Sequence, residues 1–326
     1  MPELAEIAAQ NHHIFKELQY LSNIDYKPIR YISFAHDEET YKALEASKAW
    51  SKAEMIAPKQ FREEISPYFN ANPKKYISAL VSEDCWQATP GKVVDLVRNL
   101  GIAAGGTVME DCRVLEACRE GKYTSVLVQT HDKKYVEYRT EHFVNALGSG
   151  AGKLCDSMGI DAGLYPVRHQ AFITRRLPML GKHGTNLDML IDRQDYKGFS
   201  AVYGQQIAYT GQIIGCASPK LDAMRIDKNL KVNTKAFLEI VSEMFSEWIP
   251  DLAGVGIQAV WAGYYTEPRY IVDPELGLFV GMRGHGFMLS QYIARMYVDK
   301  LLGRPVPEYF EKLKLNGPGL SEKAFK

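Results

Sequence analysis

The chain has 326 residues, enough for about two domains of roughly 150 residues each, and its 46% hydrophobic and 24% charged composition is that of an ordinary globular protein. The 39 basic and 39 acidic residues balance to a formal net charge of zero, which excludes a strong overall attraction to nucleic acid or to an anionic membrane surface. The first residues lack a signal-peptide pattern and no apolar run approaches the ~20 residues of a membrane helix, so we expect a cytoplasmic protein with no membrane span and no nucleic acid partner.

The first ninety residues predict two helices and one strand. Apolar residues at near-helical spacing predict an amphipathic helix over 3–22, and the segment 29–34 predicts a short strand. A second helix is expected over 37–50. Four prolines then make 59–90 a loop-rich segment.

From Pro90 the pattern changes to alternating helices and strands. A turn at 131–134 between two extended runs predicts an antiparallel hairpin. In chain order we expect one helix and four extended segments: 92–100, 108–115, 123–130, 135–139 and 142–147.

Residues 164–261 predict a mostly antiparallel sheet crossed by one helix. The alternation of apolar and polar residues, broken by glycines, predicts strands over 167–174, 187–192, 201–203, 206–209 and 212–216. The helix is expected over 235–248, and the last unit is a strand over 278–280, a glycine-rich turn and a helix over 287–302. This order predicts an α/β plus α+β fold, in which an α/β domain is interleaved with an antiparallel platform.

The five cysteines form no CxxC pair, and no histidine lies at metal-ligand spacing from them. An odd number of cysteines cannot all pair within one chain. We therefore expect reduced thiols and no metal site at Cys85, Cys112, Cys118, Cys155 and Cys216.

Two glycine-rich turns lie between a strand and a helix, where backbone N–H groups and the helix dipole favour electron-rich ligands. The first, GSGAGK at 148–153, misses the phosphate-binding pattern GxxxxGK[ST] by one residue, and Leu154 follows the lysine. It also misses the dinucleotide pattern GxGxxG by one position. We interpret it as a tight turn that lets a ligand pack close.

The second turn, GMRGHG at 281–286, leads directly into an apolar helix. Three glycines in six residues cost backbone entropy, and no Ser, Thr, Asp or Asn caps the helix start. The N–H donors of the first helical turn are therefore available to a ligand, although these residues alone also allow a plain turn.

Four blocks of sequence resemble the FAD-dependent amine and amino-acid oxidoreductases typified by D-amino acid oxidase, glycine oxidase and sarcosine oxidase. Their order and spacing extend from about residue 20 to residue 303, and the C-terminal part also resembles archaeal dye-linked proline dehydrogenases. The blocks are TPGK at 89–92, the strand at 107–114, FVNALGSGAG at 143–152, and WAG at 261–263 followed by DP at 273–274 and GLFVGMRGHGFML at 277–289.

The resemblance implies an FAD-binding, Rossmann-like domain interleaved with an antiparallel-sheet, substrate-binding domain. The FAD-binding domain would consist of residues 1–22, 86–163 and 262–310. The substrate-binding domain would consist of residues 23–85 and 164–261, and residues 311–326 would form a tail.

The resemblance also implies the reaction: hydride transfer from the carbon that bears the amine to N5 of the flavin, followed by hydrolysis of the imine. The substrate would be an amino acid or secondary amine such as glycine, sarcosine, proline or a D-amino acid, and the electron acceptor stays unnamed. No side chain is expected to act as a catalytic acid or base. Because no cysteine follows Cys216, the FAD would be noncovalent. The implied cofactor contacts are Val114, Ala146, Gly148, Met282, Arg283, Gly284, His285, Gly286, Phe287 and Met288.

The sequence departs from the family pattern in its nucleotide-binding unit. Family members begin with a strand, a GxGxxG turn and a helix, and this sequence contains no such segment, so the Rossmann-like domain would lack its N-terminal βαβ unit. Three explanations stay open: the sequence is a shortened version of a full enzyme, a partner subunit supplies the unit, or the protein is a noncatalytic subunit that has lost its own FAD nucleotide site.

A second departure concerns the substrate. Glycine and D-amino acid oxidases place an arginine shortly after WAG to pair with the substrate carboxylate, and here that position is Tyr265. The carboxylate could be held by Arg283, Arg269 or Arg168, with Tyr203 or Tyr265 donating a hydroxyl hydrogen bond. The alternative for each arginine is an ordinary structural or solvated ion pair.

Overall fold

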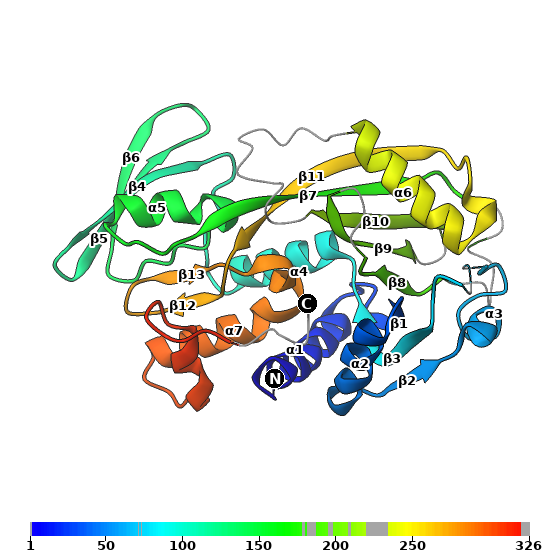
Figure 1. The fold of residues 1–326 in the computed structure, drawn as a ribbon. Helices are drawn as coiled ribbons and strands as arrows, with labels where there is room; N and C mark the ends of the chain where they lie inside the picture. The colour runs from blue at the N-terminus through cyan, green and yellow to red at the C-terminus, as the bar shows by residue number, and fades with distance from the viewer. Residues whose placement is uncertain are drawn as a thin grey trace. The chain divides into compact units, whose positions relative to one another are not determined.

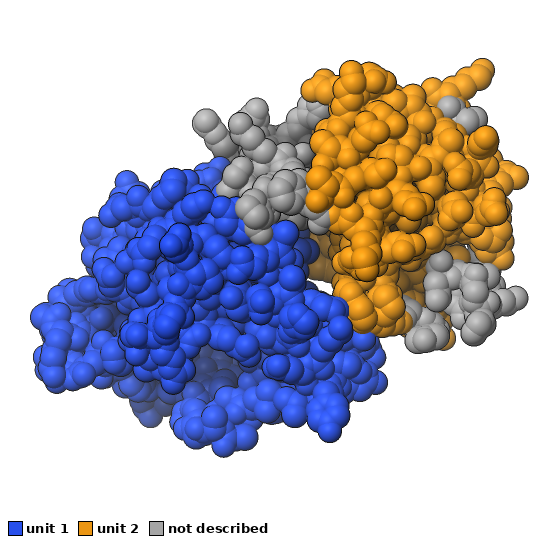
Figure 2. Space-filling model, turned by 90° about the horizontal axis from the view of Figure 1, so that it is seen from below, with its two compact units in different colours: residues 1–26, 88–166, 265–326 blue, residues 27–87, 167–264 orange. Residues whose placement is uncertain are grey.

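The computed structural model describes residues 2–70, 72, 74–177, 180, 187–194, 198–207, 210–219 and 234–320. The chain divides into two compact units, shown in blue and orange in Figure 2. Unit 1 contains Met1–Tyr26, Ala88–Pro166 and Tyr265–Lys326, and unit 2 contains Lys27–Gln87 and Val167–Tyr264. The four boundaries between the units lie two to four residues from those expected from the sequence, and unit 1 also includes the segment 311–326 that was expected as a separate tail.

Unit 2 is built on an eight-stranded sheet with the order β11-β7-β10-β9-β8-β1-β3-β2 (Figure 1). The β1–β8 pair is parallel, and the other pairs with a described register are antiparallel. The mostly antiparallel platform is therefore confirmed, and β7 and β11 continue across the boundary into unit 1. The strands are β1 Lys27–Ala35, β2 Ala53–Ile56, β3 Ser78–Gln87, β7 Tyr165–Thr174, β8 Met189–Asp192, β9 Phe199–Ile207, β10 Gln212–Pro219 and β11 Ile257–Glu267.

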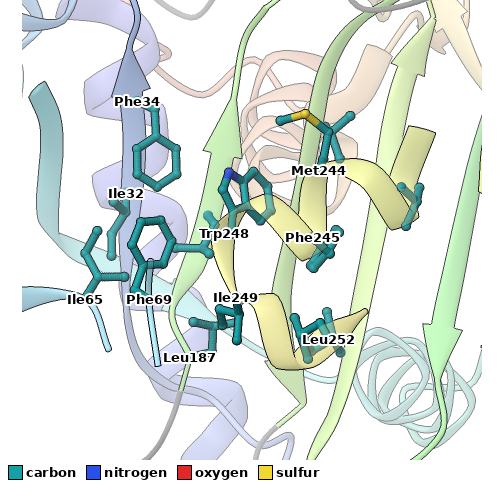
Figure 3. Close-up of a cluster of buried hydrophobic side chains, with 14 of the residues drawn as sticks. Ile32, Phe34, Ile65, Phe69, Leu187, Met244, Phe245, Trp248, Ile249 and Leu252 are labelled. Atoms are coloured by element: carbon teal, nitrogen blue, oxygen red, sulfur yellow. The ribbon is translucent and has the colours of Figure 1, made fainter. Parts of the chain in front are cut away.

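Aromatic and aliphatic side chains fill the core of unit 2 between the sheet and helix α6, Thr234–Trp248 (Figure 3). Trp248 is fully buried, and Phe34 from β1 stacks on Phe69 with ring centroids 5.5 Å apart. Burial of such rings supplies most of the packing free energy of a core. The remaining helices of unit 2 are short: α2 Glu38–Ser47, η1 Lys48–Trp50, η2 Pro58–Gln60, α3 Phe61–Glu64 and η5 Pro250–Leu252.

Two features of unit 2 differ from the sequence prediction. The segment 59–90, predicted as loop-rich, contains the ten-residue strand β3, which pairs with both β1 and β2. The strands predicted over 201–203 and 206–209 form one strand, β9, while 208 and 209 lie outside the described residues. The glycine between them, Gly204, lies within the strand and makes room for the ring of Phe245 on α6. A Cβ at this position would stand 2.5 Å from that ring.

Unit 1 is organised around two helices that pack side by side, α1 and α7 (Figure 1). The buried amide of Asn11 joins them, donating to Gln291 at 3.0 Å and accepting from the N–H of Tyr292 at 2.8 Å. The helices are α1 Pro2–Leu21, α4 Pro90–Ala103, η3 Gly148–Gly150, α5 Ala151–Ser157, η6 Arg283–His285, α7 Gly286–Leu301 and η7 Glu308–Leu313.

The strands of unit 1 form a three-stranded antiparallel sheet and a two-stranded one. The hairpin expected around the turn at 131–134 is confirmed as the β5–β6 pair. The strand expected over 108–115 begins later, and that over 142–147 is reduced to one parallel bridge between Asn145 and Leu278. The strands are β4 Arg113–Glu120, β5 Tyr123–Gln129, β6 Tyr135–Thr140, β12 Ile271–Asp273 and β13 Leu278–Val280.

The C-terminal segment differs from the expected tail. Leu313 is fully buried in the core of unit 1 together with Phe310, and Lys312 pairs with Glu3 on α1 at 2.6 Å. None of the described helices is long and apolar enough to cross a membrane.

Candidate functional site

The glycine-rich turn predicted at 281–286 follows β13 and leads through η6 into α7. The buried stripe of α7 fixes the helix, because Leu289, Ile293 and Met296 pack in the same cluster as Leu4 and Ile7 of α1. The start of α7 is therefore held rigidly within unit 1. We refer to residues 281–288 as the α7 loop.

The glycines of the α7 loop are required by the packing of the loop itself. Gly281 has φ +72°, and a Cβ there would overlap the carbonyl oxygen of Arg269. A Cβ on Gly284 would stand 2.7 Å from the ring of Tyr265, and one on Gly286 would stand 3.0 Å from the Cβ of Met282. Two of the three glycines thus let the loop lie directly against the segment 265–270.

Two polar contacts also join the α7 loop to that segment. The guanidinium Nε of Arg283 donates to Oε2 of Glu267 at 2.6 Å, and both side chains are only 10% exposed. The hydroxyl of Tyr270 lies 2.8 Å from Nδ1 of His285. Burial raises the pKa of the Tyr270 phenol, which keeps it a neutral hydrogen-bonding group.

The first turn of α7 presents the features that a flavin ring needs. No side chain caps the helix, whose N-cap residue is His285. Phe287 and Met288 are 38% and 42% exposed, so the turn is accessible. Uncapped N–H donors at the positive end of a helix dipole fit the electron-rich N1–C2=O edge of a flavin.

The turn at 148–153 is held by the buried side chain of Asn145. Its amide donates to the carbonyl of Ala151 at 3.0 Å and accepts from the N–H of Leu147 at 3.2 Å. Gly148 is left-handed, with φ +55°, and no described atom outside its chain neighbours lies within 4 Å of a Cβ built on it. The open space beside Gly148 fits the expected close approach of a ligand, and Ala146 nearby in the chain is exposed.

The strand edge beside this turn is open. The N–H of Asn145 donates to Gly277 at 2.8 Å, and its carbonyl accepts from Phe279 at 3.0 Å. The alternate residues Val144 and Ala146 make no backbone hydrogen bond to any residue that the structure describes. Unpaired strand edges of this kind are ready to accept another strand.

Helix α4 has an exposed apolar surface. Only Val93 is buried, in a cluster with Phe15, Leu18 and Ile24. Contiguous exposed apolar groups mark interaction surfaces. The exposed side chains of α4, between 40% and 62% accessible, are Val94, Val97, Leu100 and Ile102.

The remaining candidate residues lie on β-strands or donate hydrogen bonds to backbone carbonyls. Val114 is half-buried on β4 and pairs with Val128. Arg269 donates its guanidinium to the carbonyls of Gly317, at 2.9 Å, and Leu315. Tyr203 and Arg168 belong to unit 2.

Tyr203 lies on β9, opposite Cys216 of β10 and Ile191 of β8. Burial raises the pKa of the Cys216 thiol to about 11, so it stays protonated and unreactive at neutral pH. The described residues contain no group of three or more histidine, cysteine, aspartate or glutamate side chains placed to hold a metal ion.

The structure brings together Tyr265, Arg283, Gly284 and His285 from the sequence-based list, all in unit 1. It adds Glu267, which the sequence analysis missed. Glu267 and Arg283 are 16 positions apart and meet only because β11 and the α7 loop converge, so no local motif indicates the pair.

The two interleaved units and the uncapped start of α7 agree with the fold and the glycine turn expected of a cofactor-dependent oxidoreductase. The family model for FAD dependent oxidoreductases, DAO, matches residues 1–300, and the chain therefore belongs to this family. The family resemblance, the fold class and the choice of FAD as cofactor are confirmed. The chain is an FAD-dependent oxidoreductase.

Solved structures of low sequence identity share the fold. The L-proline dehydrogenase from P. horikoshii is 22% identical with a TM-score of 0.74, and the match covers 95% of this chain and 81% of that one. The glycine oxidase from Geobacillus kaustophilus is 16% identical with a TM-score of 0.77 and the same two coverages.

A third neighbour is the L-α-glycerophosphate oxidase from Mycoplasma pneumoniae with FAD bound. It is 15% identical with a TM-score of 0.70, and the match covers 90% of this chain and 79% of that one. No curated protein sequence matches the chain.

Proposed function

We propose that the chain oxidises the C–N bond of an amino acid or secondary amine, of the glycine, sarcosine, proline or D-amino-acid type, with noncovalently bound FAD. The α7 loop carries this proposal, because its uncapped first turn offers N–H donors beside an accessible surface. Structural neighbours named as a proline dehydrogenase, a glycine oxidase and an amino acid oxidase support the substrate class. The five unpaired cysteines support a reducing compartment such as the cytoplasm.

The residues of the chain would bind and orient rather than exchange protons with the substrate. FAD, when bound, supplies the chemistry by accepting a hydride from the carbon that bears the amine. The N–H groups at the start of α7 would hold the pyrimidine edge of the flavin, with Gly284, Phe287 and Met288 as the nearest residues. Gly148 and Val114 would contact the rest of the cofactor. The helix dipole would stabilise negative charge at that edge.

Within unit 1, the substrate would be held by Tyr265, Arg269 and Arg283. Each arginine carries five N–H donors. Arg269 donates to the carbonyls of Gly317 and Leu315, and Arg283 donates to Glu267. Arg283 pairs with Glu267, so its net charge toward an anionic substrate is reduced. We therefore give the Tyr265 hydroxyl the larger share in binding a carboxylate or amine.

A partner-dependent form of the same function is supported by the open strand edge at Val144 and Ala146 and by the exposed face of α4. A βαβ nucleotide-binding segment provides one strand for such an edge and one helix for such an apolar face. We propose that a segment of this type completes the adenosine and pyrophosphate site.

The test is the flavin content of the purified chain and its reduction by candidate substrates. Bound FAD should give visible flavin absorbance, and anaerobic sarcosine, L-proline, glycine or D-alanine should bleach it, whereas glycerol 3-phosphate should not. If the chain stays colourless with added FAD and becomes coloured only when co-expressed with a βαβ segment, the partner-dependent form is supported. Bleaching by glycerol 3-phosphate alone would overturn the proposed substrate class.

A further inference from the structure

Arg283 is held in an unfavourable backbone conformation. Its φ is +50°, in the left-handed region that residues with a Cβ avoid. Arginine has no short polar side chain that could stabilise this conformation locally, as asparagine and aspartate do. A contact from outside the α7 loop must therefore compensate for it.

Glu267 provides that contact. Its Oε2 accepts from Nε of Arg283 at 2.6 Å, and each side chain is 10% exposed, which makes this a nearly buried ion pair. In the pair of Lys300 with Glu311 in the same unit, the side chains are 34% and 54% exposed. Exposed ion pairs of this kind contribute little to stability. Removal of one partner from a buried pair is far more unfavourable than removal from an exposed pair.

The position of Glu267 links the pair to the cofactor site. Glu267 is the last residue of β11, and Arg283 is the first residue of η6, which leads directly into α7. The backbone turn at Arg283 sets the direction in which Gly284 and the first N–H groups of α7 point. A carboxylate that fixes Arg283 therefore also fixes the donors of the α7 loop.

We propose that Glu267 is a positioning residue, which acts through Arg283 to hold the α7 loop in the turn that presents its N–H groups to the flavin. The flavin as ligand rests on the proposed function. The role of Glu267 in holding the α7 loop does not rest on the proposed function, because it follows from the ion pair and from the backbone conformation of Arg283.

Hydrogen exchange of the flavin-free chain tests the holding of the loop. In Glu267→Gln, amides of 281–288 should exchange about 10- to 100-fold faster than in the wild type, the loss expected for a hydrogen bond to a charged group. Amides of 148–157 should be unchanged, and the matched surface variant Glu311→Gln should leave 281–288 unchanged. Equal exchange of 281–288 in Glu267→Gln and the wild type overturns the proposal.

A rescue variant separates positioning from general destabilisation. Glycine adopts a positive φ freely, so the double variant Glu267→Gln with Arg283→Gly removes both the buried charges and the backbone strain. Its loop amides should exchange at nearly the wild-type rate. Exchange as fast as in Glu267→Gln alone would show that Glu267 merely supports the fold, and would overturn the proposal.

FAD titration, followed by flavin fluorescence, distinguishes this inference from the proposed function. If the wild type binds FAD, Glu267→Gln should bind it about tenfold more weakly, whereas Glu311→Gln should bind it with the wild-type affinity. Unchanged affinity in Glu267→Gln overturns the inference. If the wild type binds no FAD but the exchange pattern holds, the positioning role stands and the proposed flavin site of the isolated chain fails.

Discussion

Replacement of Gly281 by alanine tests whether the α7 loop depends on its close approach to the segment 265–270. The added Cβ would overlap the carbonyl oxygen of Arg269 and would stand 3.0 Å from its carbonyl carbon and 3.3 Å from Cδ2 of Leu164. The residue is also left-handed, with φ +72°. One of the two backbone segments must move, and the α7 loop would lose its packing.

The expected cost combines two effects. A left-handed residue with a Cβ costs about 1–2 kcal/mol, and overpacking a tight contact costs about 1–3 kcal/mol. Gly281→Ala should therefore destabilise unit 1 by about 2–5 kcal/mol. Gly303→Ala is the matched control, because Gly303 has φ +69° but no atom within 4 Å of a Cβ, so it should show only the backbone cost of about 1–2 kcal/mol.

The assay must report on unit 1. All four tryptophans, Trp50, Trp86, Trp248 and Trp261, lie in unit 2, so tryptophan fluorescence follows the other unit. Urea unfolding of unit 1 is best followed by hydrogen exchange of the amides of α7. If Gly281→Ala is no more destabilising than Gly303→Ala, the contact with the Arg269 carbonyl does not constrain the loop and the reasoning is refuted.

Three further predictions concern the site and unit 2. Gly284→Val should drive a methyl group into the ring of Tyr265 and lower the FAD-to-protein absorbance ratio of flavin-loaded protein, while an added Tyr265→Ala should restore part of it; full occupancy in the single variant would contradict this. Burial alone would lower the pKa of His36, but its 2.6 Å hydrogen bond to Asp192 and that negative charge outweigh burial and raise the pKa. The stabilisation from this pair should be present below about pH 6.5, the ordinary histidine pKa, and be lost as the pH rises through the raised value; a pH-independent difference in unfolding between the wild type and His36→Gln would argue against it. Trp248→Ala should cost about 3–5 kcal/mol in urea unfolding of unit 2, and a loss below 1 kcal/mol, about a fivefold change in the folding equilibrium, would show that the core collapses around the cavity.

Elements with strong local signals could be predicted from the sequence. Pro90 stands at the first position of α4, where its missing N–H costs nothing and its fixed φ suits a helix. The turn at 131–134 joins β5 and β6 as expected, because hairpin pairing depends mainly on neighbouring residues. The helix α7 could be placed to within one residue at each end from its apolar stripe.

Elements whose signals depend on distant residues could not be predicted. The first part of β3, Ser78–Val81, is buried and the rest is half-buried or exposed, so the strand shows no continuous alternation. Gly204 reads as a break in the sequence but lies within β9, where it makes room for Phe245. The sequence alone does not distinguish a glycine that ends a strand from a glycine that makes room for a neighbouring side chain.

The dependence on distant residues also limits what the sequence could predict of the candidate site. The sequence singled out GMRGHG because three glycines in six residues cost backbone entropy and no side chain caps the helix that follows. In the structure, Gly281 and Gly284 make room for the carbonyl of Arg269 and the ring of Tyr265. A residue such as Glu267 carries no signal of its own, because its role appears only when its partner is known.

The contacts of the two unit 1 arginines bear directly on substrate recognition. Arg269 donates to two backbone carbonyls of the C-terminal segment, and Arg283 donates to Glu267. Both side chains are thus committed within unit 1 before any substrate arrives, and a carboxylate would have to share their donors. In the family pattern the carboxylate-binding arginine stands where this chain has Tyr265, whose hydroxyl is a weaker, uncharged donor. Under the proposed function, a substrate held by such a site would gain less from its carboxylate and more from its amine. We therefore propose a preference for a secondary amine or imino acid, whose nitrogen substituents add apolar contact, over glycine.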